Sequence, residues 1–288
     1  MKRREFLGKT TLGLGAAWLG SKGLATVAIG APGKFSATDT VTLGKTGIQT
    51  SRLAMGTGTV GYNHTSNQAK LGVKGLADLL WAGYDQGLRF FDCADSYGTH
   101  PHAAEALKRV PREKVTVLTK SWARDGEGMR KDIDRFRKEL NVDQIDILLM
   151  HCLTEADWTT RYRGAMDALS EAKEKKIIRA HGCSCHSIEA LRAAAKSPWV
   201  EVDLARLNPI GSHMDADPQT VLSVLWEMRA AGKGIVGMKI LGQGDMRRRQ
   251  DEALKYALSS GVLDAFTIGA ESRDEQADLL KRISTAVV

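Results

Sequence analysis

The sequence predicts an α/β fold, a (β/α)8 TIM barrel preceded by a β-hairpin. Short apolar runs, typical of parallel strands that are covered on both faces, alternate with segments of helical period. Eight such units fit into about 245 residues, which is the usual size of this fold. The chain has 288 residues, of which 43% are hydrophobic and 26% charged, so one large domain with a substantial core is expected.

The predicted elements follow one another in a regular order. In residues 41–56, VTLGKTGIQTSRLAMG, a hairpin turns at Lys45 to Gly47 and leads into a strand that ends at Gly56. Seven further strands are expected at 88–94, 115–120, 145–151, 178–184, 202–208, 235–241 and 265–270. Helices are expected at 68–86, 129–140, 163–173, 187–196, 218–231 and 251–259.

The first residues differ in character from the rest. The opening, MKRREFLGKTTLGLGAAWLG, has Arg3 and Arg4 before Phe6 and then a glycine-rich, mildly apolar stretch. It resembles a twin-arginine export signal; a frayed basic terminus that runs into an amphipathic helix is the alternative. Lys22 and several glycines interrupt the apolar stretch, so a stable membrane-spanning helix is not expected.

The chain is therefore expected to have three parts: a twin-arginine signal segment over 1–31, a linker over 32–40 and the barrel over 41–288. The signal predicts an exported, periplasmic protein with the twin-arginine translocase as its transport partner. A signal that stays uncleaved would act as an anchor. Residues 1–40 carry six Lys or Arg against two acidic residues, which leaves +3 of the +7 net charge for the barrel. This is an ordinary surface charge, so no nucleic-acid partner is expected.

The four cysteines all fall within or at the ends of predicted strands. Cys183 and Cys185 are too close in sequence for an easy disulfide. Two separated Cys-x-x-Cys pairs, the usual pattern of a metal or iron–sulfur centre, are absent from the sequence. Cys93, Cys152, Cys183 and Cys185 are therefore predicted to be small core residues, and no metal is expected.

Titratable side chains stand at the carboxyl ends of three consecutive predicted strands. In FFDCADSYG, residues 90–98, an apolar strand ends at Asp92 and Tyr97 lies just beyond it. Lys120 closes the next strand and His151 the one after that. Because the carboxyl ends of the strands form the active-site face of such a barrel, the four side chains are expected to converge.

Four groups of these types can protonate a carbonyl oxygen. A free tyrosine has a pKa of about 10, and the buried ammonium of Lys120 is expected to lower the pKa of Tyr97. Asp92 would keep Lys120 charged, and His151 would donate a hydrogen bond to the substrate oxygen. No side chain donates hydride, so a nicotinamide cofactor, NADPH or NADH, is required.

These motifs resemble the aldo-keto reductase family. The resemblance rests on FFDCADSYG, VLTKSW, DILLMH and the opening LGKTGIQTSRLAMGTGT, and it covers residues 41–283. It implies that Asp92, Tyr97, Lys120 and His151 are the catalytic residues of an NAD(P)H-dependent carbonyl reductase or alcohol dehydrogenase. The family pattern assigns no role to Asp95, which is expected to be a solvated or loop-capping carboxylate.

The resemblance also implies contacts to the cofactor. It places them at Gly56, Thr57, Ser184, Met238, Lys239, Leu241, Glu271, Ser272, Arg273 and Gln276. The sequence departs from the family where Cys185 replaces a common Asn, Leu204 replaces a common Gln, and Met238 replaces the aromatic ring of many members. A flexible thioether can still cover the face of a ring.

The preference between NADPH and NADH is left open by the segment TIGAESRDEQ. Glu271 stands where members that prefer the phosphorylated cofactor often have Lys, and a carboxylate repels a 2′-phosphate but can accept a hydrogen bond from a ribose hydroxyl. Arg273, in contrast, could bind a phosphate.

Two functions of other classes fit part of the pattern. In a barrel lyase, Lys120 would form a Schiff base, but this leaves Tyr97 and the hairpin unexplained. An exported barrel that binds the cofactor with little turnover agrees with the altered nicotinamide contacts. In each case the substrate, a small molecule, is expected to be selected by loops at 61–68, 121–128, 152–158 and 211–217, with Trp122 and Trp158 as candidates for the pocket wall.

Overall fold

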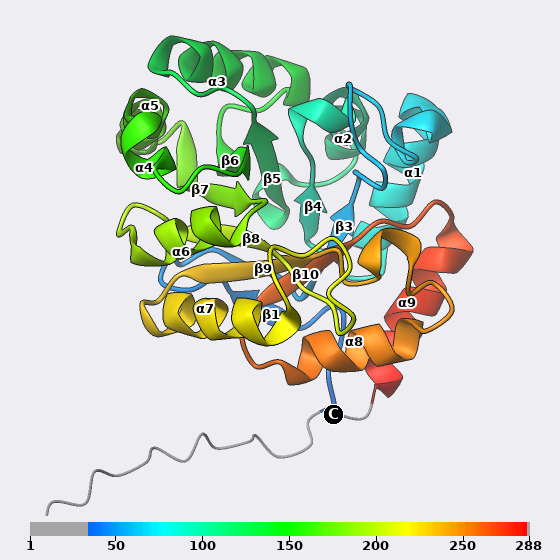
Figure 1. Cartoon of the computed structure of the whole chain (residues 1–288). Helices are drawn as coiled ribbons and strands as arrows, with labels where there is room; N and C mark the ends of the chain where they lie inside the picture. The colour runs from blue at the N-terminus through cyan, green and yellow to red at the C-terminus, as the bar shows by residue number, and fades with distance from the viewer. Residues whose placement is uncertain (1–33, 287–288) are drawn as a thin grey trace, which may run out of the picture. The chain divides into compact units, whose positions relative to one another are not determined.

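A closed barrel of parallel strands forms the centre of the computed structural model, which describes residues 34–286 (Figure 1). The strands are β3 (Leu53–Gly56), β4 (Phe90–Asp92), β5 (Thr116–Ser121), β6 (Ile145–Leu153), β7 (Ile178–Cys185), β8 (Val202–Arg206), β9 (Gly234–Met238) and β10 (Ala265–Ile268). They follow one another around the barrel in sequence order, and β10 pairs with β3 to close it. The predicted (β/α)8 fold is confirmed.

The predicted hairpin is present and lies at the amino-terminal end of the barrel. It consists of the antiparallel strands β1 (Thr40–Thr42) and β2 (Gln49–Ser51). Its buried residues Leu43 and Ile48 belong to the same apolar cluster as the inward-facing strand residues, so the hairpin closes the barrel from below. Gly44 has a φ of 49°, and a Cβ there would lie 2.3 Å from the backbone nitrogen of Gly234, so the turn requires glycine.

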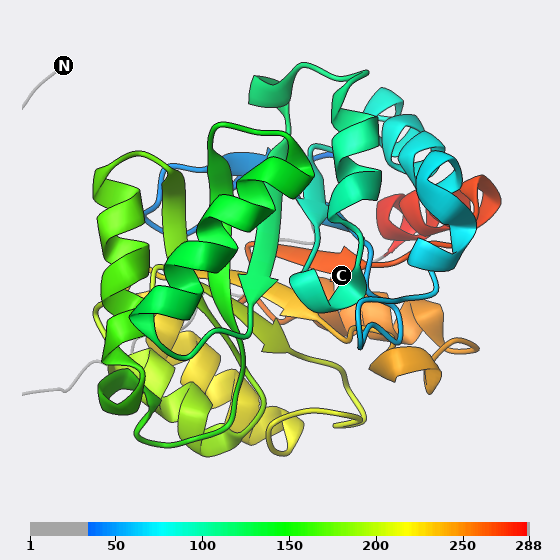
Figure 2. The ribbon, with the colours of Figure 1, turned by 90° about the horizontal axis from the view of Figure 1, so that it is seen from above.

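Helices surround the strands on the outside (Figure 1 and Figure 2). Within residues 34–286 they are α1 (Gly72–Asp85), α2 (His100–Leu107), α3 (Gly126–Leu140), α4 (Trp158–Arg161), α5 (Arg163–Glu174), α6 (Ile188–Lys196), α7 (Pro218–Ala230), α8 (Gln250–Ser259) and α9 (Arg273–Thr285). The six helices predicted from the sequence are all present, within a few residues of their expected ends.

The differences from the prediction have local causes. The helix expected from residue 68 begins at Gly72, because residues 69–71 form a 3-10 turn. The strand expected to reach residue 241 ends at Met238, because Lys239 adopts a left-handed φ of 57°. The helix α9 was not predicted: it is highly charged, and its described buried residues are only Gln276, Leu279 and Ile283.

Side chains of the strands pack into two separate cores. The inner core fills the barrel with residues such as Phe90, Leu118, Leu149 and Val236. The outer core lies between the strands and the helices and includes Cys93, Cys183 and Cys185. These three cysteines are buried as predicted, whereas Cys152 is partly exposed; all four are free thiols.

The predicted signal segment 1–31 and part of the linker lie outside the described residues. Among residues 34–286, none of the helices combines the length and the apolar character needed to cross a membrane.

Candidate active site

Strand alternation directs one side chain per strand toward the carboxyl-terminal mouth of the barrel. Asp92, Lys120 and His151 each follow an inner-core residue by two positions, and successive side chains of a strand point to opposite faces. The same alternation places one residue of each strand at the mouth: Gly56, Asp92, Lys120, His151, Ser184, Arg206, Met238 and Thr267. The mouth therefore collects three of the four predicted catalytic residues directly from the strands.

Lys120 and Asp92 form a buried ion pair at this mouth. The Lys120 Nζ donates to Asp92 Oδ1 at 2.6 Å and to the carbonyl oxygen of Cys93 at 2.7 Å. Lys120 is fully buried and Asp92 is 4% exposed. A buried ammonium needs such partners, because removing it from water without them is costly.

Tyr97 reaches the same point from the loop after β4. It closes the 3-10 turn η2 (Asp95–Tyr97), and its hydroxyl lies 3.5 Å from the Lys120 Nζ. Gly58 and Gly61 pack against the ring; a Cβ at either position would lie within 2.3 Å of a ring carbon of Tyr97. The sequence TGTVG thus leaves room for the ring and holds it over Lys120.

His151 borders the tyrosine ring. The centroids of the two rings are 5.9 Å apart in an edge-to-face arrangement. The His151 Nδ1 is buried and finds no hydrogen-bond partner among residues 34–286. Burial, together with the positive charge of Lys120, holds the pKa of His151 well below 6.5, so the imidazole is neutral at physiological pH.

The protonation state of Tyr97 differs from the expectation. Burial raises the pKa of Tyr97 above 10, and the opposing effect of Lys120 is smaller. The predicted lowering of this pKa is therefore wrong for the protein alone, because desolvation of the phenolate outweighs the field of one ammonium that Asp92 already neutralises in part. Burial lowers the pKa of Lys120, but the negative charges of Asp92 and Tyr97 raise it by more than burial lowers it. Lys120 therefore stays charged.

A cavity of about 220 Å³ opens next to Tyr97. It is lined by residues of β3, β4, β9 and β10 and the loops that follow them: Gly56, Gly58, Thr59, Val60, Asp92, Tyr97, Met238, Lys239, Ile240, Leu241, Gln243, Gly244, Thr267, Ile268 and Gly269. Four of the predicted cofactor contacts are among them, namely Gly56, Met238, Lys239 and Leu241.

Two further hydroxyl groups at the mouth are unsatisfied. Ser184 Oγ and Thr267 Oγ1 are both buried, and neither has a hydrogen-bond partner within the described part of the chain. Ser184 is a predicted cofactor contact, whereas Thr267 was missed; the alternation along β10 was the signal that could have identified it. Thr267 lines the cavity, whereas Ser184 lies at the mouth outside its lining. Buried hydroxyls without partners at the mouth fit a ligand that carries amide or hydroxyl groups.

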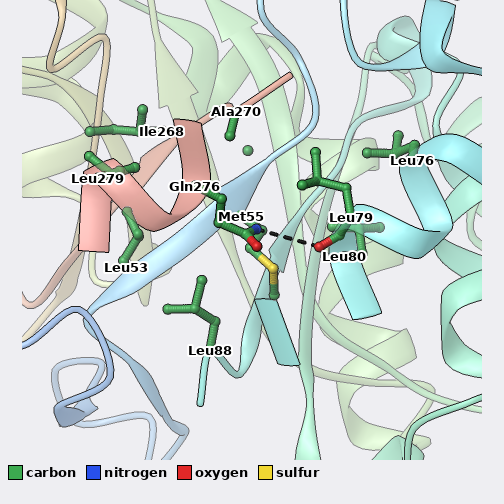
Figure 3. Close-up of a pocket in the computed structure, with 11 residues that line it drawn as sticks. Leu53, Met55, Leu76, Leu79, Leu80, Leu88, Ile268, Ala270, Gln276 and Leu279 are labelled. Carbon is green, nitrogen blue, oxygen red and sulfur yellow. Dashed lines mark hydrogen bonds between the residues drawn. The ribbon is translucent and has the colours of Figure 1, made fainter. Parts of the chain in front are cut away.

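Ser184 and five other predicted cofactor contacts do not line this cavity, and two of these five are buried elsewhere. Thr57 is buried, and its hydroxyl bonds to the Asp92 carbonyl and to Thr99, so it braces the strand end. Gln276 points from α9 into a small apolar void between β3 and α1, where its amide lies 3.5 Å from the carbonyl of Leu79 (Figure 3). Neither side chain is therefore placed to contact a ligand in the cavity.

The remaining three predicted contacts lie just beyond the cavity, at the amino-terminal end of α9. Glu271 is exposed and accepts a hydrogen bond from Asn67 Nδ2 at 2.7 Å. Ser272 caps α9 by accepting from the Glu275 backbone N–H. Arg273 is the first residue of this helix and is exposed.

The other candidates of the sequence are also placed. Asp95 was expected to be a solvated or loop-capping carboxylate, but its side chain is 14% exposed and pairs with Arg135 of α3 at 2.7 Å. Trp122 is 44% exposed, with its ring centroid 5.3 Å from that of His151, so it stands at the mouth. Trp158 is fully buried and donates to the Ala190 carbonyl, so it is a core residue and does not wall the pocket.

Known proteins resemble this chain in sequence. It is 27% identical over 167 residues to an NADH-specific methylglyoxal reductase of Escherichia coli, a match over 50% of this chain and 51% of that protein. It is 22% identical over 199 residues to a D-threo-aldose 1-dehydrogenase of a Pseudomonas species, over 58% and 59% of the two chains. The chain thus spans about half the length of these curated relatives.

Solved structures share its fold. An aldo-keto reductase from Bacillus halodurans, in its holo form, superposes with a TM-score of 0.72 at 15% identity, over 87% of this chain and 92% of that one. A Bombyx mori aldo-keto reductase in complex with NADP gives a TM-score of 0.66 at 15% identity, over 87% and 89%.

A sequence model of a protein family also matches this chain. The model described as "Aldo/keto reductase family" matches residues 52–276, which include all eight strands of the barrel and the four clustered side chains. The chain belongs to the aldo/keto reductase family.

Proposed function

We propose that this protein is an NAD(P)H-dependent oxidoreductase that reduces an aldehyde or ketone to an alcohol, or catalyses the reverse reaction. The observation that carries the proposal is the tyrosine hydroxyl held 3.5 Å from a buried, ion-paired lysine beside a cavity. Methylglyoxal and aldoses, the compounds in the names of two relatives, suggest a small carbonyl substrate.

In this proposal Tyr97 is the proton donor. Its raised pKa keeps the phenol protonated, so the proton is available to a carbonyl oxygen at neutral pH. The Lys120 ammonium stabilises the phenolate that the transfer leaves behind, and Asp92 holds that ammonium in place and charged. The neutral His151 donates a hydrogen bond that orients the substrate oxygen toward Tyr97.

The residues of the cavity and of the barrel mouth fit a nicotinamide cofactor, which supplies the hydride when bound. Ser184 Oγ and Thr267 Oγ1 can hydrogen-bond a carboxamide, since both are buried without a partner in residues 34–286. Met238 and Leu241 offer apolar surface for a ring, and Lys239 offers a positive charge. Glu271, Ser272 and Arg273 would meet the adenosine end beyond Gly269.

The structure disfavours the barrel lyase with a Schiff base. Such a lysine must be neutral to attack a carbonyl, but Lys120 is fully buried, charged and bonded to Asp92 and the Cys93 carbonyl. Borohydride reduction with a carbonyl substrate should therefore leave the protein unlabelled. Covalent labelling of Lys120 would favour the lyase instead.

The two pKa shifts predict the pH dependence of the reaction. Reduction needs the phenol of Tyr97 and a neutral His151. Since the pKa of Tyr97 lies above 10 and that of His151 well below 6.5, kcat/KM should be constant from about pH 6.5 to about pH 9. Alcohol oxidation needs the phenolate and should rise as the pH approaches and passes 10. Steady-state profiles in both directions test this. A fall in reduction between pH 6.5 and pH 9 would contradict the assigned protonation states.

Reversing the charge of Glu271, at the proposed adenosine end of the site, is expected to change the preference between NADPH and NADH. Glu271→Lys should raise the affinity for NADPH relative to NADH, because it replaces a repulsive carboxylate with an ammonium next to the 2′-phosphate. Fluorescence titration with both cofactors measures the ratio. Glu271→Gln, which only removes the charge, is the matched control and should give a smaller change. An unchanged ratio in Glu271→Lys would show that Glu271 does not face the ribose.

We also propose that the protein is exported through the twin-arginine translocase and acts in the periplasm, on the sequence of residues 1–31. Since that route carries folded proteins, the cofactor could leave the cell already bound. Replacing Arg3 and Arg4 with Lys should retain the protein in the cytoplasm, as measured by cell fractionation of the full chain. Unchanged distribution between the fractions would contradict the signal.

A further inference from the structure

A second group of chemically active side chains lies on the other side of the barrel wall. Cys183 and Cys185 project from the outer face of β7, and Asp203 lies beside Cys183 on β8. The helices α6 and α7 lie outside these strands (Figure 1). Each of the three is at most 1% exposed. None of them belongs to the candidate active site at the mouth of the barrel.

The distances within this group match those of metal ligands. Two thiolates and a carboxylate bound tetrahedrally to Zn²⁺ lie about 3.8 Å apart for sulfur and sulfur and about 3.5 Å apart for sulfur and oxygen. In the structure the two sulfur atoms are 3.8 Å apart, and Cys183 Sγ is 3.4 Å from Asp203 Oδ1. One ligand atom from each residue lies within 4.8 Å of the other two.

The carboxylate of Asp203 lacks the partners that burial requires. Its Oδ1 accepts only a thiol hydrogen bond, and its Oδ2 is buried with no partner among the described residues. The nearest cation, Lys233, donates its hydrogen bonds to the carbonyls of Ser197 and Val200 instead. A buried carboxylate is normally compensated by full hydrogen bonding or by a cation.

A neighbouring acid adds to this deficit. The Oδ2 of Asp215 is also buried and unpartnered within residues 34–286, and the charge of Asp215 acts on both Asp203 and Cys185. Asp215 is paired through its other oxygen with Arg206, so it is not counted among the ligands. A bound cation would supply the partner that the buried Asp203 Oδ2 lacks among residues 34–286.

We propose that Cys183, Cys185 and Asp203 bind one thiophilic cation of the Zn²⁺ type, as a structural site between the barrel wall and the helices. The proposal does not depend on the catalytic function. It has a consequence for the mouth, however, because Ser184 lies between the two cysteines and faces the other side of the strand. A cation bound here would stiffen the strand end that carries Ser184.

Co²⁺ is the probe for this site, because thiolate ligation gives it an intense charge-transfer absorption that oxygen and nitrogen ligands do not give. The site is closed to solvent, so the cation must enter while the chain folds. The full chain should therefore be produced in cells grown in minimal medium with Co²⁺. One equivalent of cobalt and the charge-transfer band are expected in the purified protein.

Single substitutions then identify the ligands. Cys183→Ser and Cys185→Ser should each lose the band, and Asp203→Asn should lose most of the bound cobalt. Cys93→Ser, which changes a buried cysteine just after β4, should retain both the band and the cobalt. The wild-type spectrum decides the matter even if a variant fails to fold. Two results would contradict the proposal: no band in the wild-type protein, or a band as intense in Cys183→Ser and Cys185→Ser as in the wild type. Either would mean that these side chains form only a protonated hydrogen-bonded cluster.

Discussion

Tyr97→Phe is expected to lower the turnover of carbonyl reduction by about 10² to 10⁴-fold, the usual contribution of general acid catalysis. The phenol acts on the substrate oxygen, and its hydroxyl lies 3.5 Å from the Lys120 Nζ that stabilises the phenolate. Cofactor affinity should stay close to that of the wild type, because the ring that borders the cavity is retained. Steady-state turnover and fluorescence titration with NADPH measure the two effects.

The control for this change is Tyr84→Phe. Tyr84 lies on the outer helix α1, where its ring stacks against Arg89, so loss of its hydroxyl should leave turnover unchanged. A Tyr97→Phe protein that keeps more than about a tenth of the wild-type turnover would contradict the assignment, because it falls short of the smallest contribution expected of an acid catalyst.

Lys120→Met is expected to be comparably severe for activity and also to destabilise the fold. The substitution leaves the Asp92 carboxylate buried without its cation, and breaking a buried ion pair in this way typically costs about 3 to 5 kcal/mol. Chemical denaturation gives the change in the free energy of unfolding, and the same samples give the turnover.

A double variant separates the two roles of Lys120. Lys120→Met combined with Asp92→Asn removes both charges and should recover part of the stability, because no uncompensated carboxylate remains. It should recover no activity, because the phenolate of Tyr97 still lacks its ammonium. Recovery of turnover together with stability would show that Lys120 serves the fold alone.

Much of the fold was predictable because its signals are local. Parallel strands that are covered on both faces read as apolar runs, and each predicted run lies on a strand of the barrel. The helices α2 and α9 escaped prediction because their stability comes from packing on neighbours: α2 carries two histidines and a proline in its first three residues. Strand β9 ends earlier than predicted because Lys239 adopts a left-handed backbone conformation, which no sequence pattern indicated.

The site was predictable where topology alone determines position. Asp92, Lys120 and His151 close neighbouring strands, so a correct count of strands brings them together. The net pKa shift of Tyr97 was not predictable, because it depends on how deeply the ring is buried. The orientation of Gln276 depends on the void beside Met55, which only the packed structure reveals (Figure 3). The grouping of Asp203 with two cysteines likewise requires the register of β7 and β8.

The most direct test of the proposed function is a titration of the purified barrel with NADPH and NADH, followed by addition of a carbonyl compound to the bound cofactor. Methylglyoxal and a series of aldoses form the first panel. The proposal predicts saturable quenching of protein fluorescence by at least one cofactor, and then oxidation of that cofactor only when a carbonyl is present. Saturable binding without carbonyl-dependent oxidation across aldehydes, ketones and sugars would indicate a cofactor-binding barrel with little turnover, and no binding of either cofactor would contradict the proposed site itself.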